Sequence, residues 1–416
     1  MYSHDTFGLG HIRRTLLIAE HITNSFPDVS TLILTGSSMI HDMRIPPNVD
    51  YIKVPCLTKH SNSCYQPKFL TRSPDHVRKV RQEIITNTIR EFSPDALLVD
   101  KVPMGAVGEL LPSLHRLKGY PRRTRVILGL RDILDDRNQV RAEWTKGGVF
   151  EVLETCYDDI WVYGMKDMFD VVEEYGLSPS IAEKVHYCGY LKRGGELADP
   201  EEIKRRLGIS GGRLVLMVLG GGGDGNGLVR IFMDAVRELS RAEDIRGLIV
   251  TGPDFPKDEM GLLRREDTNG SMIVKDYTSD ILDFMNAADL VVSMSGYNTI
   301  CEILSLNKKS IVIPRVTPRK EQLIRASLFS GRGLLTMIHP DELTADALKV
   351  EMLRVLSSRS RSIHPFEQVD FNGLEAISER FEIIRQWMAL GSSLPAPSDR
   401  RFLQEVSGPD LRRKSR

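Results

Sequence analysis

The sequence predicts an α/β protein built from two doubly wound domains, each a parallel sheet covered by helices. Three observations predict this class. Apolar runs of four to six residues alternate with segments of helical period through most of the 416 residues. The runs are continuously hydrophobic, as in strands that are buried on both faces. The same succession starts again after residues 192–200, a polar stretch that carries glycines and a proline.

In the first half, the apolar runs predict strands at 31–34, 51–54, 96–99, 126–129 and 159–162, with helices at 12–24 and 75–91. A glycine-bearing turn at residues 7–13 precedes the first helix. Such a turn normally follows a buried strand, yet residues 1–6 are not a hydrophobic run. Either the first strand is very short, or the gene product begins several residues earlier.

In the second half, strands are predicted at 214–219, 247–250, 271–274, 290–293 and 310–313. We place the domain boundary so that residues 1–192 form an N-terminal domain and residues 193–373 form a C-terminal domain. The helix at 374–390 is predicted to return to the N-terminal domain. Residues 391–416 carry a net charge of +3 and little to bury, which predicts a disordered basic tail.

Composition excludes several classes of protein. The 56 basic and 56 acidic residues give no net charge, which argues against a partner that is a nucleic-acid polymer. No apolar run reaches the length of a membrane span, no signal peptide opens the chain, and five scattered cysteines give no disulfide or zinc pattern. We therefore expect a cytoplasmic protein, with peripheral attachment at the inner membrane face left open.

Three loops carry the chemistry that the sequence predicts. Gly8 and Gly10 lie directly before an amphipathic helix, and the glycine run 220–225 lies between a strand and a helix. Both arrangements suit an anion, because glycines let it approach the backbone and a helix N-terminus offers N–H groups. In the third loop, 294–298, two interpretations compete. Thr299 and Glu302 have the spacing of a capping box, which needs no ligand, while Glu302 also suits the hydroxyls of a ribose.

At this point the sequence resembles a family. The segment 293–302, followed by Pro314 and by Glu321-Gln322, resembles the nucleotide-sugar site of the GT-B glycosyltransferases of family 28. The opening Gly8-Leu-Gly-His11 and the run 220–225 resemble the two glycine loops of that family. The similarity is dense in residues 5–20, 214–236 and 274–326. It looks strongest for predicted bacterial glycosyltransferases that open with Ser-His-Asp-Thr-Phe-Gly-Leu-Gly-His.

The resemblance implies two domains facing across a cleft, the GT-B fold, with residues 1–192 on the acceptor side and residues 193–373 binding the nucleotide-sugar. It also implies a role for each matching residue. His11 would be the catalytic base or would position the acceptor. The residues that would bind substrate come from both domains: Gly8 and Gly10 in the N-terminal loop; Arg193, Gly222, Gly223, Ser295, Gly296, Asn298 and Thr299 around the diphosphate; Thr278 at the nucleobase; Glu302 at the ribose; Glu321 and Gln322 at the sugar.

No metal and no cofactor are expected. Metal-dependent glycosyltransferases of the other common fold hold their ion through an Asp-x-Asp pair, and no two aspartates in this sequence have that spacing. The leaving diphosphate would then be stabilised by helix dipoles, backbone N–H groups and cations. The acidic cluster of Asp132, Asp135 and Asp136 is interpreted mainly as a solvated loop.

The leading hypothesis is a metal-independent glycosyltransferase, a hexosyltransferase of class EC 2.4. It would move a hexose or N-acetylhexosamine from a UDP-sugar to an unidentified acceptor, lipid-linked or small. Two alternatives stay open. One is a nucleotide-sugar 2-epimerase, and the other is a non-catalytic nucleotide-sugar-binding protein in which a poorly anchored His11 loop does no chemistry. The sequence does not identify the sugar, the acceptor or the oligomeric state.

Overall fold

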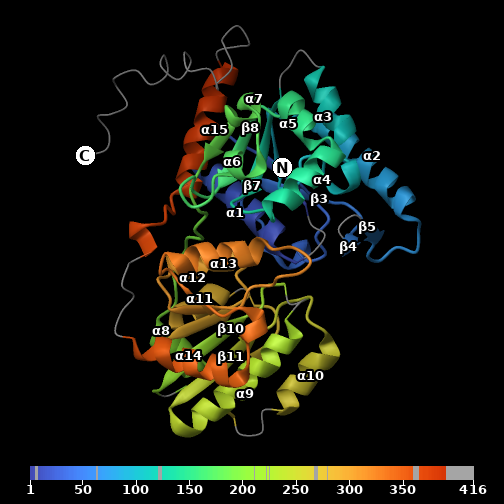
Figure 1. Ribbon diagram of the computed structural model, residues 1–416. Helices are drawn as coiled ribbons and strands as arrows, with labels where there is room; N and C mark the ends of the chain where they lie inside the picture. Colours follow the sequence, from blue (N-terminus) through green and yellow to red (C-terminus); the bar gives the residue numbers. More distant parts are fainter. Residues whose placement is uncertain are drawn as a thin grey trace.

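The computed structural model describes residues 1–4, 8–61, 64–119, 124–209, 211–221, 223, 225–266, 270–278, 280–358 and 365–389. Two parallel sheets lie one above the other, each with helices packed against it (Figure 1). The predicted fold class, two doubly wound α/β halves, is confirmed. The predicted disordered tail lies outside the described residues.

The first sheet has the order β3-β2-β1-β6-β7-β8-β9, and its paired strands are parallel. Its strands are β1 (Tyr2–Ser3), β2 (Thr31–Thr35), β3 (Val49–Lys53), β6 (Ala96–Asp100), β7 (Arg125–Arg131), β8 (Asp159–Tyr163) and β9 (Val185–Tyr187). The helices of this half are α1 (Gly10–Ser25), α2 (Pro74–Phe92), α3 (Leu111–Lys118), α4 (Arg137–Gly147), α5 (Val149–Cys156), α6 (Val171–Tyr175) and α7 (Pro179–Ala182). An antiparallel hairpin that was not predicted, β4 (Leu57–Ser61) and β5 (Cys64–Pro67), projects beside them.

The second sheet has the order β12-β11-β10-β13-β14-β15 and is also parallel. Its strands are β10 (Arg213–Val218), β11 (Ile245–Val250), β12 (Met272–Lys275), β13 (Leu290–Ser293), β14 (Ser310–Val312) and β15 (Thr336–Met337). Its helices are α8 (Pro200–Arg206), α9 (Asn226–Ala242), α10 (Lys257–Glu266), α11 (Ile281–Ala287), α12 (Tyr297–Ser305), α13 (Glu321–Gly331) and α14 (Ala345–Ser357).

Burial explains why these runs form strands. From the second residue onward, β10 is buried along its length, and β8 is buried at all five positions. A parallel strand that is covered by helices on both faces gains from apolar side chains at every position. The predicted strands therefore agree with the observed ones to within two residues. Two strands have only two residues: β15, at the edge of the second sheet, and β1, which lies in the middle of the first sheet.

The last described helix, α15 (Gly373–Ala389), lies against the first sheet although it follows the second in sequence (Figure 1). Arg380 Nη2 donates to Asp159 Oδ1 on β8 at 2.9 Å. The ring of Phe381 packs on Phe26, just after α1, with their centroids 5.4 Å apart. The chain thus passes between the halves twice, at residues 188–199 and again before α15, and the two passages meet where Leu191 and Asn372 form an antiparallel bridge.

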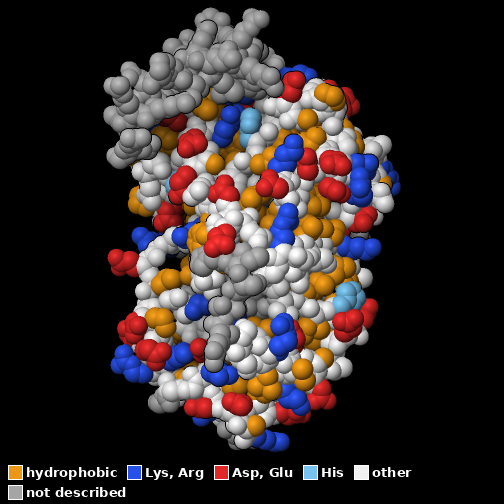
Figure 2. Space-filling view, turned by 60° about the vertical axis from the view of Figure 1, so that its left-hand side comes forward, with side chains coloured by type: hydrophobic (Ala, Val, Ile, Leu, Met, Phe, Trp, Pro, Cys, Tyr) orange, Lys and Arg blue, Asp and Glu red, His pale blue; other side chains and the backbone are white. Residues whose placement is uncertain are grey.

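On the face shown in Figure 2, acidic and basic side chains are interspersed rather than gathered by sign. Within the described ranges, none of the helices combines the length and the apolar character that are needed to cross a bilayer.

Candidate active site

The candidate site lies where the two halves face each other, at the carboxyl ends of their strands. Open parallel sheets bind ligands at this end, because loops and helix N-termini gather there. Gly8 follows β1 with φ of +67°, and a Cβ at Gly221, in the glycine run after β10, would lie 3.0 Å from the Cα of Gly8. The two glycine loops therefore approach each other closely. Asn298 Nδ2, on α12, donates to the carbonyl oxygen of Gly10 at 3.1 Å.

His11 lies in the first turn of α1 and is held by a carboxylate that the sequence analysis missed. Its Nδ1 contacts Oδ2 of Asp100, the last residue of β6. Arg14, one turn further along α1, donates through Nε to Oδ1 of the same carboxylate at 3.0 Å. Because a carboxylate only accepts hydrogen bonds, we assign the proton to Nδ1, and Nε2 is then left as the basic nitrogen. Asp100 thus fixes both the tautomer and the orientation of the ring.

The charges of this triad are set by burial and by one another. Burial lowers the pKa of His11 to about 4, although Asp100 acts in the opposite direction. Burial alone would raise the pKa of Asp100, but the Arg14 and His11 charges hold it far below its ordinary value. At neutral pH the imidazole is therefore neutral and the carboxylate is ionised. A neutral imidazole beside a fixed carboxylate is able to accept a proton.

The end of β13 and the loop that leads from it to α12 carry two hydroxyls without a hydrogen-bond partner among the described residues. The hydroxyls of Ser293 and Ser295 are fully buried and have no hydrogen-bond partner among the described residues. Ser295 has φ of +62°, a left-handed conformation that few residues other than glycine adopt. Gly296 is the N-cap of α12 and supplies no side-chain cap. The helix therefore begins with backbone N–H groups that no capping side chain satisfies, a setting that suits an anion.

The competing capping-box interpretation of Thr299 and Glu302 is wrong. The helix begins at Tyr297, so that Thr299 lies inside its first turn rather than at the N-cap. The buried Glu302 instead accepts a hydrogen bond from Arg193 Nη1 at 3.0 Å, and Arg193 lies on the passage between the halves. Glu302 was expected at the ribose and Arg193 at the diphosphate. The structure brings the two side chains together.

Other predicted substrate-binding residues surround the same cleft. Glu321 accepts a hydrogen bond from Arg315 Nη2 at 2.8 Å, and the side-chain oxygen of Gln322 accepts one from the Arg315 backbone at 2.9 Å. Burial opposes ionisation of Glu321, but Arg131 and Arg315 hold its pKa below the ordinary value. Thr278 Oγ1 accepts from the backbone N–H of Asp280 at 3.1 Å.

Two further predicted residues belong to the glycine run after β10. Gly223 lines a cavity of 210 Å³ together with Gly8 and residues of the hairpin. Beside this cavity Lys68 and Asp254 form an ion pair of 3.5 Å that joins the two halves. Gly222 lies outside the described residues.

The acidic loop that was interpreted as solvated is buried between the halves, and that interpretation is wrong. Asp132 is 1% exposed and accepts hydrogen bonds from Arg325 of α13 at 2.7 and 3.0 Å. Asp135 is 2% exposed and pairs with Arg319 at 3.0 Å. These carboxylates follow β7, and their partners come almost two hundred residues later. They join the two halves around the cleft.

Arg131, at the end of β7, is a second cation that the sequence analysis missed. Its Nε is buried without a hydrogen-bond partner among the described residues, and burial lowers the pKa of its guanidinium to about 10. The only sequence signal for these two residues is that Asp100 directly follows the predicted strand 96–99 and that Arg131 lies two residues after the predicted strand 126–129. Over the described ranges, no group of three or more histidine, cysteine, aspartate or glutamate side chains is arranged to hold a metal ion.

Comparisons with known proteins give the same family for the second half. Residues 215–380 match the glycosyltransferase family 28 C-terminal domain. A relative from Alkaliphilus metalliredigens, named UDP-N-acetylglucosamine–N-acetylmuramyl-(pentapeptide) pyrophosphoryl-undecaprenol N-acetylglucosamine transferase, is 28% identical over 85% of this chain and 89% of its own. The chain is a GT-B glycosyltransferase that resembles family 28.

Solved structures resemble this glycosyltransferase along most of its length. The calicheamicin glycosyltransferase CalG4 aligns with a TM-score of 0.59 at 10% identity, covering 95% of this chain and 98% of its own. MurG of Acinetobacter baumannii aligns with a TM-score of 0.53 at 13% identity, covering 90% and 96%. At such low identity these likenesses show the GT-B fold alone. An uncharacterized glycosyltransferase from Methanopyrus kandleri is 25% identical over 44% of this chain and 53% of its own.

Proposed function

We propose that this glycosyltransferase moves a hexose or N-acetylhexosamine from a UDP-sugar to an acceptor hydroxyl or amine without a metal ion. The relative from Alkaliphilus metalliredigens supports the choice of donor, since its name specifies UDP-N-acetylglucosamine. That name also specifies an undecaprenol-linked acceptor, which makes a lipid-linked acceptor the first candidate here. Peripheral contact with the inner membrane face would bring the enzyme to such an acceptor.

The observation that carries the proposal is the pair formed by His11 and Asp100. With Nδ1 bound to the carboxylate, Nε2 of His11 faces the acceptor and accepts its proton. The acceptor atom then forms a bond to the anomeric carbon as the bond from that carbon to the diphosphate oxygen breaks. The proton goes to His11, the sugar goes to the acceptor, and UDP leaves with the bonding electrons. Asp100 stabilises the imidazolium that results.

The donor would lie against the N-terminus of α12. Its diphosphate would accept hydrogen bonds from the backbone N–H groups at the start of α12 and from the hydroxyl of Ser295. No capping side chain bonds these N–H groups, and the hydroxyl has no hydrogen-bond partner among the described residues. Gly10, Asn298, Thr299 and the glycine run would form the rest of this cradle. Arg193 would shift from Glu302 to the diphosphate, and the freed carboxylate would bind the ribose hydroxyls. Glu321 and Gln322 would contact the sugar, and Thr278 the base.

Two earlier alternatives lose support. The non-catalytic alternative depended on a poorly anchored His11 loop, whereas Asp100 and Arg14 anchor this histidine. For the epimerase alternative, the relatives reported above all carry the names of transferases.

The first experiment is a thermal-shift panel of UDP-, GDP- and TDP-sugars, because a bound ligand stabilises the folded protein by RT ln(1 + [L]/Kd). We expect UDP-sugars to raise the melting temperature by about 5–10 °C at a hundredfold excess over Kd, and the other sugars to raise it less. UDP release is then measured with polyprenyl-diphosphate sugars as acceptors, with and without a chelator. No shift with any nucleotide-sugar would refute the donor site. Release that the chelator abolishes would refute the metal-independent mechanism.

A further inference from the structure

The Nε of Arg131, at the carboxyl end of β7, is buried and donates to no acceptor among the described residues. Three other arginines in this part of the cleft each have a carboxylate partner: Arg14 pairs with Asp100, Arg325 with Asp132, and Arg315 with Glu321. Taking a guanidinium out of water without satisfying its N–H groups costs free energy. The N–H of Arg131 therefore needs an acceptor that the described residues do not supply.

The second half of the molecule holds a matching unsatisfied atom, Oε2 of Glu321. Glu321 is the first residue of α13 and is 5% exposed. Its Oε1 accepts a hydrogen bond from Arg315, whereas its Oε2 is buried without a donor among the described residues. An ionised carboxylate only accepts hydrogen bonds, and a guanidinium only donates them. Each half thus leaves one strong hydrogen-bonding group unused, and the two groups are of opposite kind.

The loop after β7 is docked on α13 in a way that brings Arg131 beside Glu321. Asp132, the residue after Arg131, accepts a hydrogen bond from Arg325 at 2.7 Å, and Arg325 lies one helical turn after Glu321. Asp135 accepts one from the backbone N–H of the N-cap residue of α13, also at 2.7 Å. Glu321 lies on the helix between these two contacts. The loop therefore holds Arg131 next to it.

The face of β7 that carries Arg131 is the face that meets α13. Alternate residues of a strand share a face, so Ile127 lies on the same face as Arg131. Ile127 packs in one cluster with Ala326 and Phe329 of α13. Burial opposes ionisation of Glu321, and Arg131 is the first of the charges that lower its pKa all the same. The two charged groups are thus close, although no hydrogen bond joins Nε of Arg131 to Oε2 of Glu321.

A single hydroxyl group would satisfy both atoms, because it donates its hydrogen to the carboxylate and accepts from the guanidinium. A phosphate or a carboxylate would instead place a second anion against Oε2 of Glu321, and an ammonium would be repelled by Arg131. An apolar group would satisfy neither atom. Since Arg131 and Glu321 belong to different halves, a hydroxyl bound by both would join the halves across the cleft.

We propose that Arg131 and Glu321 together bind one hydroxyl of the sugar that is transferred, and that Arg131 makes the enzyme select donors that carry this hydroxyl. The inference rests on the proposed function, in which the sugar contacts Glu321. It adds a specificity-determining residue from the half that was expected on the acceptor side. A sugar without this hydroxyl leaves both charged groups unsatisfied and is therefore a poor donor.

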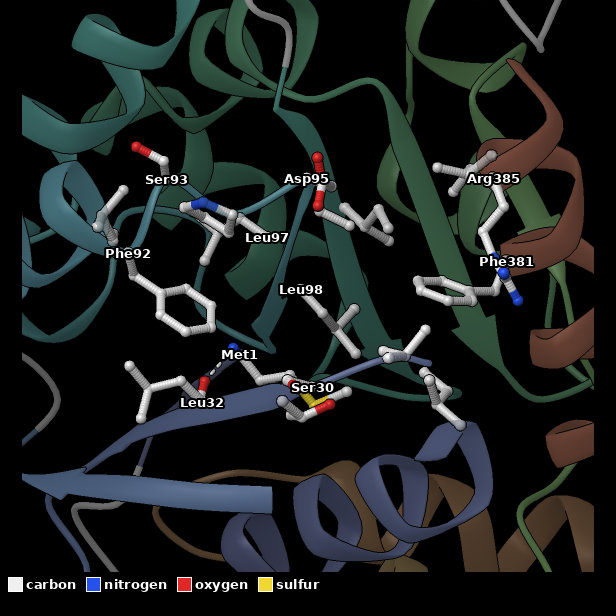
Figure 3. A pocket seen from close by; sticks show the side chains of 18 of the residues that line it. Met1, Ser30, Leu32, Phe92, Ser93, Asp95, Leu97, Leu98, Phe381 and Arg385 are labelled. Atoms are coloured by element: carbon white, nitrogen blue, oxygen red, sulfur yellow. Dashed lines mark hydrogen bonds between the residues drawn. The ribbon is translucent and has the colours of Figure 1, made fainter. Parts of the chain in front are cut away.

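The test measures donor selection by the full chain, by Arg131→Met and by the matched control Arg385→Met. Arg385 lies beside a cavity of 490 Å³ at the opposite end of the first sheet, where the strands begin (Figure 3), and it pairs with Asp28. The donors are the UDP-sugar that gives the largest thermal shift and a set of its analogues, each of which lacks one hydroxyl of the sugar. The value of kcat/KM for UDP release is measured for each donor.

For one of the analogues, the unaltered enzyme should have a kcat/KM at least about a hundredfold below that for the parent donor, because hydrogen bonds to two charged groups are missing. Arg131→Met should lower kcat/KM for the parent donor about ten- to a hundredfold and leave the value for that analogue nearly unchanged. Arg385→Met should keep the preference of the unaltered enzyme. The affinity for UDP alone should be equal in all three proteins, because UDP carries no sugar.

A second variant, Arg131→Lys, keeps the positive charge and covers the case in which Arg131→Met does not fold. Its preference for the parent donor should lie between those of the unaltered enzyme and Arg131→Met. A full preference in both variants would overturn the proposal, as would an equal loss with every donor, which would indicate a general effect on the fold. UDP-sugars that are used with an unchanged preference would overturn this inference alone. A failure of the unaltered enzyme to bind any UDP-sugar would refute the proposed function and this inference with it.

Discussion

At the start of α1, the side chains of His11 and Arg14 contact the carboxylate of Asp100, whereas at the junction of β13 with α12 the hydroxyls of Ser293 and Ser295 contact no described partner. Both junctions are loops from a strand to a helix at the same cleft. The first is complete without substrate, which suits a base that must be oriented beforehand. The second leaves polar groups that only a ligand would satisfy. The difference assigns chemistry to one junction and donor binding to the other.

The largest effect should follow removal of the base. We expect His11→Ala to lower kcat on the order of 10²–10⁴-fold, with little change in the KM for the UDP-sugar, because the imidazole acts on the acceptor proton. The control is His41→Ala, since His41 is exposed and bonds Tyr51 outside the cleft. Steady-state UDP release measures both variants. A rise in the donor KM at unchanged kcat would contradict the catalytic role and would show that His11 binds the donor instead.

The decrease of kcat at acidic pH tests the lowered pKa of His11 in the same part of the site. Because burial lowers the pKa of His11 to about 4, the base stays neutral well below pH 6.5. At pH 5 an imidazole with the ordinary pKa would be about 97% protonated, a loss of about thirtyfold in rate. We expect kcat to fall less than about twofold between pH 7 and pH 5, with far-ultraviolet circular dichroism confirming a folded protein at each pH. A limb centred near pH 6.5 would contradict a buried His11.

The same protonation affects stability in a definite direction. Since the folded pKa of His11 is lower than the unfolded one, folding is favoured while the ring is neutral, and this contribution is lost as the pH falls below about 6.5. The Asp100 contribution is present above its unfolded pKa of about 3.9 and is lost as the pH falls further.

At the second junction, Glu302→Gln should act on binding. Losing the charge of this buried carboxylate weakens its bonds to the ribose by about 1.4 kcal/mol, so we expect a rise in the donor KM of about tenfold at nearly constant kcat. Glu83→Gln, at an exposed position on α2, is the matched control. Titration with UDP alone, followed by calorimetry, separates binding from turnover. An unchanged affinity for UDP would show that Glu302 does not bind the nucleotide.

The smallest effect belongs to Ser295→Ala. The substitution deletes a buried hydroxyl that has no described partner, so that the melting temperature without ligand should stay equal or rise slightly. With a UDP-sugar the shift should shrink by a few degrees, because one hydrogen bond to the diphosphate is missing. Ser240→Ala serves as the control, since this hydroxyl bonds within α9. A loss of stability without ligand would show that Ser295 is satisfied within the protein.

The sequence predicted the strands and helices that surround the cleft better than the side-chain pairs that meet in it. Continuous apolar runs such as 214–219 mark buried strands, because a parallel strand between helix layers needs apolar side chains throughout. The pairing of His11 with Asp100 joins residues 89 positions apart, and that of Arg325 with Asp132 joins residues 193 apart. No local pattern encodes such pairs, since only the folded topology makes them neighbours. The capping box failed because the start of α12 at Tyr297, and not the spacing of two polar residues, decides which residue caps the helix.

The paired passages of the chain between the halves constrain how the cleft can open. Leu191 and Asn372 form a bridge, Tyr190 N–H donates to the carbonyl oxygen of Asp370 at 2.8 Å, and a Cβ at Gly373 would lie 2.7 Å from the oxygen of Tyr190. Two separated tethers would hold the sheets in one relative orientation. Two tethers bound side by side act as one, so that any change in the angle between the halves would turn about this point. Such a change would have to break the ion pairs of Asp132 with Arg325 and of Asp135 with Arg319 on the far side of the cleft.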